Sequence, residues 1–122
     1  LMAPYSVSKY AVLALTESLR AEMEMLKAPV GVSLLAPGPV KTGIFRSPFG
    51  TAPNPAVEGF VQNMREMLAQ NGLEPDVFAS RVFDGIHAGQ FWLIPQPEVF
   101  DQAYRAHADG VLARRNPRLP QY

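Results

Sequence analysis

Two side chains near the start of the chain have types and spacing that suit proton transfer. Tyr5 and Lys9 are four residues apart, so on a helix their side chains lie on one face. A phenol is a weak base at neutral pH, but a neighbouring ammonium and the positive end of a helix dipole both stabilise the phenolate. Such a tyrosine can exchange a proton with an alcohol or carbonyl oxygen. By spacing alone these pairs are commonplace, and an ordinary helix surface is then the better interpretation.

The pair opens a stretch with a helical pattern, from about residue 5 to residue 26. Pro4 fits the entrance of a helix, where its missing N–H costs nothing, and Ala28-Pro29 ends the pattern. Tyr10 and Leu13 lie off the main apolar face, which indicates a helix buried on several sides. The main face is formed by apolar residues at spacings of three and four, namely Val12, Leu15, Leu19, Met23 and Leu26.

A short apolar run from Val30 to Ala36 predicts a strand buried on both faces of a parallel sheet. Pro37-Gly38-Pro39 turns this strand into a loop, and residues 42–55 are rich in Gly, Pro, Ser and Asn, as loops are.

Three more helices and one more strand follow. Asn54 and Pro55 suit an N-cap and a first helical residue, and Asn71-Gly72 closes that helix. The other patterns predict a helix over 75–88, a buried strand over 91–94 that includes Trp92, and a helix over 97–114, with a loose tail from Arg115. Helices and strands that alternate in this order favour an α/β layer with parallel strands.

Composition excludes several classes of function. The 122 residues are 48% apolar, have a formal net charge of zero and include no cysteine, so nothing attracts nucleic acid or an anionic membrane surface, and neither disulfides nor thiolate metal sites are possible. No apolar run reaches the roughly 18 residues of a membrane helix, and the first residues do not resemble a signal peptide. His87 and His107 lack partners at metal-ligand spacing, and Arg114-Arg115 is a short solvated pair. We predict a cytoplasmic protein without a metal site.

Three segments in register resemble the short-chain dehydrogenase/reductase family. PYSVSKYAVLALTESLRAEM resembles its catalytic helix with the motif Tyr-x-x-x-Lys, VGVSLLAPGPVKT resembles the next strand and Pro-Gly loop, and FWLIPQPE resembles the last strand. The resemblance extends over nearly the whole chain. It implies an α/β fold in which residues 1–122 are the C-terminal part of one Rossmann-type domain, with two strands and four helices of a doubly wound parallel sheet.

The resemblance also implies a reaction, namely the NAD- or NADP-dependent interconversion of an alcohol and a carbonyl in a small molecule. Tyr5 would be the general acid/base, and Lys9 would hold the nicotinamide ribose hydroxyls and favour the phenolate. Pro37 and Gly38 would shape the loop beside the nicotinamide. The backbone of Val40 and the side chain of Thr42 would contact the carboxamide or the phosphates.

The segment from about residue 43 to residue 72 would cover the substrate by the same resemblance. Its apolar side chains would suit a nonpolar substrate, although plain core packing explains them as well; they include Ile44, Phe45, Phe49 and Phe60. Met64 and Met67 are expected in the core or the pocket lining.

The chain departs from the family pattern in what it lacks. It has no Gly-rich phosphate loop, and the substrate-polarising serine and the relay asparagine of the family precede the tyrosine by more than four residues. Ser6 and Ser8 cannot replace that serine, because both lie inside the Tyr5–Lys9 motif. We therefore expect the N-terminal dinucleotide-binding half to be absent and the isolated chain to be inactive. The resemblance also suggests a homo-oligomer through the 5–26 helix, and the alternative function is a non-catalytic fragment that pairs with full-length relatives.

Overall fold

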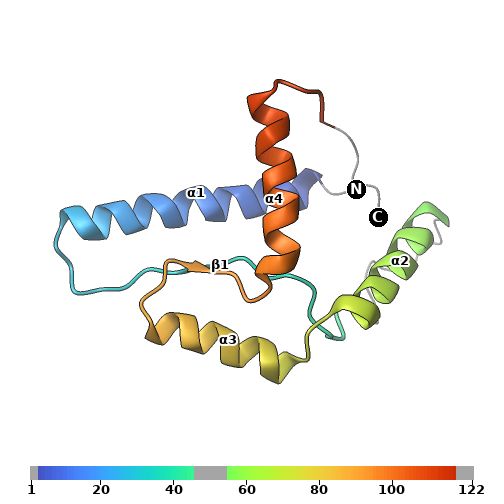
Figure 1. Cartoon of the computed structure of the whole chain (residues 1–122), viewed down its shortest axis with the longest axis horizontal. Helices are drawn as coiled ribbons and strands as arrows, with labels where there is room; N and C mark the ends of the chain where they lie inside the picture. Colours follow the sequence, from blue (N-terminus) through green and yellow to red (C-terminus); the bar gives the residue numbers. More distant parts are fainter. Residues whose placement is uncertain (1–2, 46–54, 118–122) are drawn as a thin grey trace.

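A computed structural model describes residues 3–45 and 55–117 of the chain. In these ranges the chain forms four helices and a two-stranded parallel sheet, so the expected α/β arrangement is confirmed (Figure 1). In chain order the elements are α1 (Ala3–Met25), β1 (Leu34–Leu35), α2 (Pro55–Asn71), α3 (Pro75–His87), β2 (Trp92–Leu93) and α4 (Pro97–Leu112). The N-cap predicted at Asn54 and the tail beyond residue 117 lie outside the described residues.

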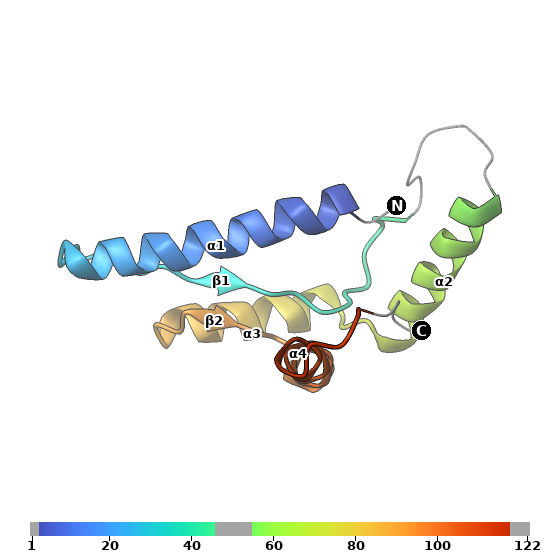
Figure 2. The same ribbon diagram turned by 90° about the horizontal axis from the view of Figure 1, so that it is seen from above.

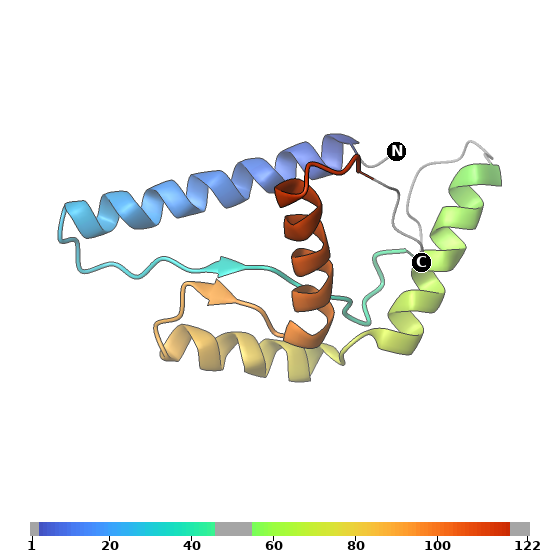
Figure 3. The ribbon, with the colours of Figure 1, turned by 45° about the horizontal axis from the view of Figure 1, so that its top comes forward.

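The two strands pair in parallel, with Leu34 opposite Trp92 and Leu35 opposite Leu93. α1 and α3 lie on opposite sides of this pair, while α4 runs crosswise to α1 (Figures 1 and 3). Both strands are shorter than the predicted 30–36 and 91–94. On the β1 side the ladder ends at the Ala36 N–H, 2.9 Å from the Leu93 carbonyl, because Pro37 and Pro39 have no N–H to donate.

Tight packing joins α3 to β2. Leu93 is only 5% exposed, and Gly85 of α3 is buried against it. A Cβ at position 85 would lie 2.6 Å from Leu93 Cδ2, which is closer than carbon atoms approach without repulsion. The missing side chain at Gly85 is therefore what allows the helix to lie this close to the strand.

The outward faces of α1 and β2 differ from the sequence predictions. In α1 the half-buried positions form the row Leu13, Thr16, Arg20 and Met23, whereas most of the predicted apolar face is exposed, including Val12, Leu15, Leu19 and Leu26. Trp92, predicted to be packed, is 45% exposed, and its ring makes a T-shaped contact with the Phe91 ring, with 5.0 Å between ring centroids. The reason is that close packing against a helix is seen for β2 with α3, while the pattern of apolar residues implied that both faces of each strand are covered.

Three of the helices are followed closely by a residue with positive φ. α3 ends before Gly89, whose φ of 66° lies in the left-handed region that glycine adopts freely. α1 ends before Lys27 and α4 before Arg114, which have φ of 50° and 53°. α4 therefore stops at Leu112, two residues earlier than predicted. Within the described ranges, no helix combines the length and the apolar character needed to cross a membrane.

The contact of α3 with β2 predicts opposite effects for two glycine substitutions. Gly85→Ala should destabilise the native polypeptide by about 1–3 kcal/mol, because the new methyl group overlaps the Leu93 side chain. Gly110→Ala in α4 is the matched control, since nothing lies within 4 Å of its Cβ position, and it should stabilise by up to about 1 kcal/mol. Urea unfolding measures both. Equal effects of the two substitutions would contradict this packing.

Candidate functional site

Tyr5 and Lys9 lie together at the start of α1. The Lys9 Nζ is 5.3 Å from the centroid of the Tyr5 ring, within the range of a cation–π contact. Tyr5 is 56% exposed, so its hydroxyl is open to a small molecule. The helix thus brings together the two side chains that the sequence singled out, with the ammonium over the ring.

The helix also sets the direction in which this pair faces. Tyr5 and Lys9 continue, at spacings of three and four, the row that Leu13 and Met23 share on the half-buried side of α1. The first turns of α1 lie at the same end of the molecule as the loop that leaves β1 (Figures 1 and 2). Ser8 is not free to help, because its hydroxyl donates a 2.7 Å hydrogen bond to the Tyr5 carbonyl.

The loop after β1 contains the other predicted site residues. Pro37 and Thr42 are exposed, whereas Gly38 and Val40 are half-buried. The Thr42 Oγ1 accepts a 3.4 Å hydrogen bond from the Ile44 N–H, which caps a local turn. Among the described residues, no hydrogen bond or ion pair links this loop to Tyr5 or Lys9. The two groups of predicted residues therefore share one end of the molecule without direct polar contact.

The junction between α2 and α3 holds this loop. Val40 and Leu73 form an isolated parallel bridge, in which the Lys41 N–H donates to the Leu73 carbonyl at 2.9 Å and the Leu73 N–H donates to the Pro39 carbonyl at 3.0 Å. The Lys41 ammonium also pairs with Glu74 at 2.6 Å. Pattern reasoning missed this anchor, because no local signal at Leu73 or Glu74 indicates a partner more than thirty residues away.

A second anchor lies at the end of the loop, where α2 holds the Phe45 carbonyl. Arg65 donates two hydrogen bonds to this oxygen, from Nε at 3.0 Å and from Nη2 at 2.8 Å. Phe45 and Phe60 are half-buried and Ile44 is exposed, while Phe49 lies outside the described residues. Val61 is the buried residue of the apolar face of α2, and Met64 and Met67 are half-buried. The described part of the substrate segment is thus partly core and partly open surface.

A third contact comes from the segment between β2 and α4. Gln96 is buried to 2% exposure and packs against Gly38. The sequence feature that could have indicated this contact is a polar residue between Pro95 and Pro97, directly after a predicted buried strand.

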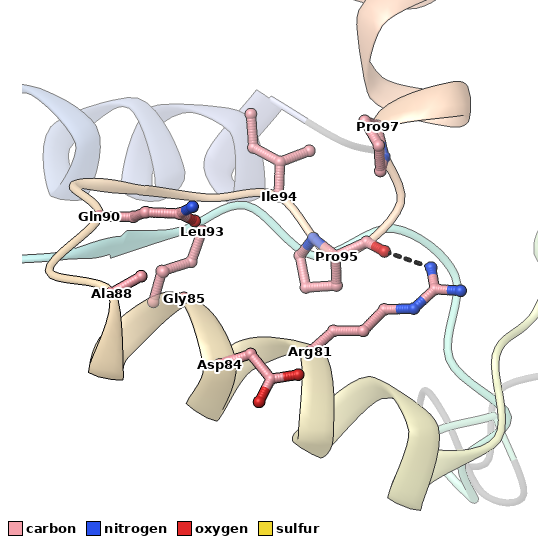
Figure 4. Close-up of a pocket in the computed structure, with 9 residues that line it drawn as sticks. All are labelled: Arg81, Asp84, Gly85, Ala88, Gln90, Leu93, Ile94, Pro95 and Pro97. Atoms are coloured by element: carbon pink, nitrogen blue, oxygen red, sulfur yellow. Dashed lines mark hydrogen bonds between the residues drawn. The ribbon is translucent and has the colours of Figure 1, made fainter.

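An open pocket of about 500 Å³ is lined in part by the same segment (Figure 4). Two of its lining residues are joined by a 2.6 Å hydrogen bond from Arg81 Nη1 to the Pro95 carbonyl. None of the predicted site residues lines it; its lining comprises Arg81, Asp84, Gly85, Ala88, Gln90, Leu93, Ile94, Pro95 and Pro97. The described ranges also contain no group of three or more side chains that could hold a metal ion.

Known proteins with similar sequences are named as oxidoreductases. The chain is 29% identical over 119 residues to the C alpha-dehydrogenase of a Sphingobium species, a match that covers 91% of this chain and 38% of that protein. It is 31% identical over 110 residues to the protein named "Putative oxidoreductase SadH" in Mycobacterium tuberculosis, covering 90% of this chain and 36% of that protein. The chain therefore spans little more than a third of the length of these relatives. No family model matches it, and no solved structure matches it.

The anchor at the α2–α3 junction predicts which contacts hold the loop. Gly72→Ala should destabilise the native polypeptide by about 1–3 kcal/mol, because its Cβ would meet the Leu68 carbonyl and lie 2.9 Å from Lys41 Cγ. Glu74→Ala should change stability by less than about 1 kcal/mol, because the ion pair with Lys41 is largely exposed. Denaturant unfolding compares the two. A larger loss for Glu74→Ala would mean that the ion pair, and not the backbone bridge, fixes the loop.

Proposed function

We propose that the chain is part of an oxidoreductase of the short-chain dehydrogenase/reductase type, which interconverts an alcohol and a carbonyl with NAD or NADP. The observation behind the proposal is the Tyr5–Lys9 pair, with the ammonium 5.3 Å from the ring centroid. This pair lies at the end of the molecule where β1 runs into the Pro-Gly loop (Figure 2). In open α/β sheets, ligands bind beyond the carboxyl ends of the strands, which is where both groups lie.

Two further observations support this proposal. The two relatives described above are named as a dehydrogenase and a putative oxidoreductase, at about 30% identity over nine-tenths of this chain. The described residues form an α/β arrangement with parallel strands, which suits the C-terminal part of a Rossmann-type domain. We propose that residues 1–122 are such a part, and that the Gly-rich loop for the dinucleotide phosphates lies outside it.

In the proposed reaction Tyr5 handles the proton. For alcohol oxidation, the phenolate of Tyr5 accepts the hydroxyl proton as the carbonyl forms; for reduction, the phenol returns a proton to the new alkoxide. The Lys9 ammonium lies over the Tyr5 ring, 5.3 Å from its centroid, and so places a positive charge beside the reacting side chain. The exposure of both side chains leaves room for a small substrate beside the Tyr5 hydroxyl.

The cofactor supplies the hydride chemistry when it is bound, and the protein positions it. The described residues fit the nicotinamide end of such a molecule. Lys9 and Thr42 present exposed polar groups for ribose hydroxyls and a carboxamide or phosphate. Gly38 has no side chain and is flanked by Pro37 and Pro39, which restrict the backbone.

The role of Tyr5 predicts a selective loss of turnover. In the native polypeptide at its full natural length, Tyr5→Phe should lower kcat by at least about 100-fold, the usual contribution of general acid/base catalysis. The dissociation constant for NADH or NADPH should stay within about twofold, because only the hydroxyl is removed. Tyr10→Phe is the matched control, since Tyr10 lies on the same helix and is also exposed, and it should leave both values unchanged.

The measurement pairs steady-state alcohol oxidation with fluorescence titration of the reduced cofactor. Unchanged turnover in Tyr5→Phe would remove the assigned role. Absence of binding of either cofactor by the unaltered protein would remove the proposed activity.

A second proposal is that the protein associates through α1. The same surface would serve if the chain were a non-catalytic fragment that pairs with full-length relatives. Val12, Leu15, Leu19 and Leu26 form an exposed apolar row at helical spacing, and an unburied row of this kind favours packing against another helix. We propose that residues 5–26 form the contact between two copies of the protein. Antiparallel or parallel pairing of the same row would satisfy two-fold symmetry.

Association through this row predicts that one charge will disrupt the oligomer. Leu15→Glu, at a position 69% exposed, should convert a dimer of the native polypeptide into a monomer, because it places a carboxylate in an apolar contact. Ala21→Glu introduces the same residue at an exposed position on another side of α1 and should leave the dimer intact. Sedimentation equilibrium measures the masses. A monomeric unaltered protein would contradict the proposal.

A further inference from the structure

Gln96 is a buried polar residue at the edge of the candidate site. It is 2% exposed, and its Oε1 accepts no hydrogen bond from any residue in the described ranges. Its Nε2 reaches only the Asn71 carbonyl, at a long 3.4 Å. Buried side-chain amides are normally well bonded, so polar bonding does not account for the position of this one.

Gln96 is also the residue before the first turn of α4, where a side chain commonly caps the helix. Here it makes no cap bond; the backbone carbonyl of Gln96 instead accepts the Val99 and Phe100 N–H groups, both at 3.2 Å. The side chain is therefore released from the helix end and points toward the loop after β1.

Its contact in that loop is Gly38. A Cβ on Gly38 would collide with Gln96 Oε1 and lie 2.9 Å from its Cδ and 3.2 Å from its Cβ. The side chain thus occupies the volume that any residue larger than glycine would need. Because Gln96 is enclosed, it has little room to withdraw, and the loop backbone must rest directly against its amide.

The backbone beneath Gln96 is fixed in turn. Pro95 and Pro97 restrict the dihedral angles on both sides, and Arg81 of α3 donates a 2.6 Å hydrogen bond to the Pro95 carbonyl (Figure 4). The backbone at Gln96 is therefore restricted, and the loop that its side chain contacts is restricted as well, by Pro37 and Pro39. A side chain between two such segments sets the distance between them.

We infer that Gln96 is the positioning residue of the Pro37–Val40 loop: its length and volume set where Gly38 lies, and thereby the affinity for the nicotinamide end of a dinucleotide. This inference rests on the proposed function for its ligand. The packing of Gln96 on Gly38 does not depend on any ligand, so the two can be tested separately.

The test uses four variants of the native polypeptide at its full natural length, titrated with NADH and with NADPH at a temperature where all are folded. Gln96→Ala should weaken binding of the preferred cofactor about tenfold, while Gln96→Met, which keeps the length without the amide, should stay within about threefold. Gly38→Ala should also weaken binding about tenfold. The double variant should bind more tightly than either single variant, because the new methyl group occupies space that Gln96 has left.

Each outcome of this test is decisive. Strictly multiplicative losses in the double variant, or a loss in Gln96→Met equal to that in Gln96→Ala, would overturn the positioning role. So would a lower urea midpoint in Gln96→Ala with unchanged cofactor affinity, which is the result expected of a residue that acts only on stability. If the unaltered protein binds neither cofactor, the proposed function fails. The contact would still be established if the shifts in urea midpoint of Gly38→Ala and Gln96→Ala do not add in the double variant.

Discussion

The parallel pairing of β1 with β2 is the constraint on which the rest of the candidate site depends. Two residues of each strand are paired, Leu34 with Trp92 and Leu35 with Leu93, and parallel strands place their carboxyl ends at one edge. Pro37-Gly38-Pro39 and Pro95-Gln96-Pro97 therefore leave the sheet side by side. Without this register Gln96 would not face Gly38.

The two halves of the candidate site are held by different kinds of interaction. The loop after β1 is fixed by three tertiary contacts. Its backbone forms hydrogen bonds with Leu73, its Phe45 carbonyl accepts hydrogen bonds from Arg65, and its Gly38 packs against the Gln96 side chain. The Tyr5–Lys9 geometry is fixed within one helix, where α-helical spacing alone places the ammonium near the ring. α1 itself is only half-buried on its inner side, so its own rigidity orients the pair more than its packing does.

Local patterns predicted the order and type of the elements well, because prolines mark the starts of helices in the sequence. Pro55, Pro75 and Pro97 begin helices in the structure where the sequence predicted them, since proline suits the first turn. Strand lengths were overestimated, because apolar character shows that a segment can be buried but not how many partners it has. The helix α1 was expected to be buried on several sides, but in the structure it has no buried residue, and only the row that includes Leu13 is half-buried. Leu13 and Leu15 are equally apolar, so the pattern alone could not tell which of them lies on the covered side.

The candidate site was predictable only in its local part. Tyr5 and Lys9 share a helix face, and this follows from their numbers alone, whereas the partners of the loop are 20 to 60 residues away in the chain. Contacts of this kind depend on the register of the strands, which no single segment of sequence encodes. Gln96 illustrates the difference, because its place between two prolines after a strand marks it as unusual, but only the structure shows that it is buried against Gly38.

Three glycines allow close contacts between segments around the sheet. Gly38 leaves room for the Gln96 side chain, Gly72 for Lys41, and Gly85 for Leu93. None of these positions has a positive φ, and their value therefore lies in the missing side chain and not in backbone freedom. Burying an amide whose oxygen has no hydrogen-bond donor lowers stability by about 1–3 kcal/mol. At position 96 this loss comes together with the close contact between Gln96 and Gly38. The buried Gln96 amide thus lowers stability but defines the position of the loop, at the place where the proposed ligand would bind.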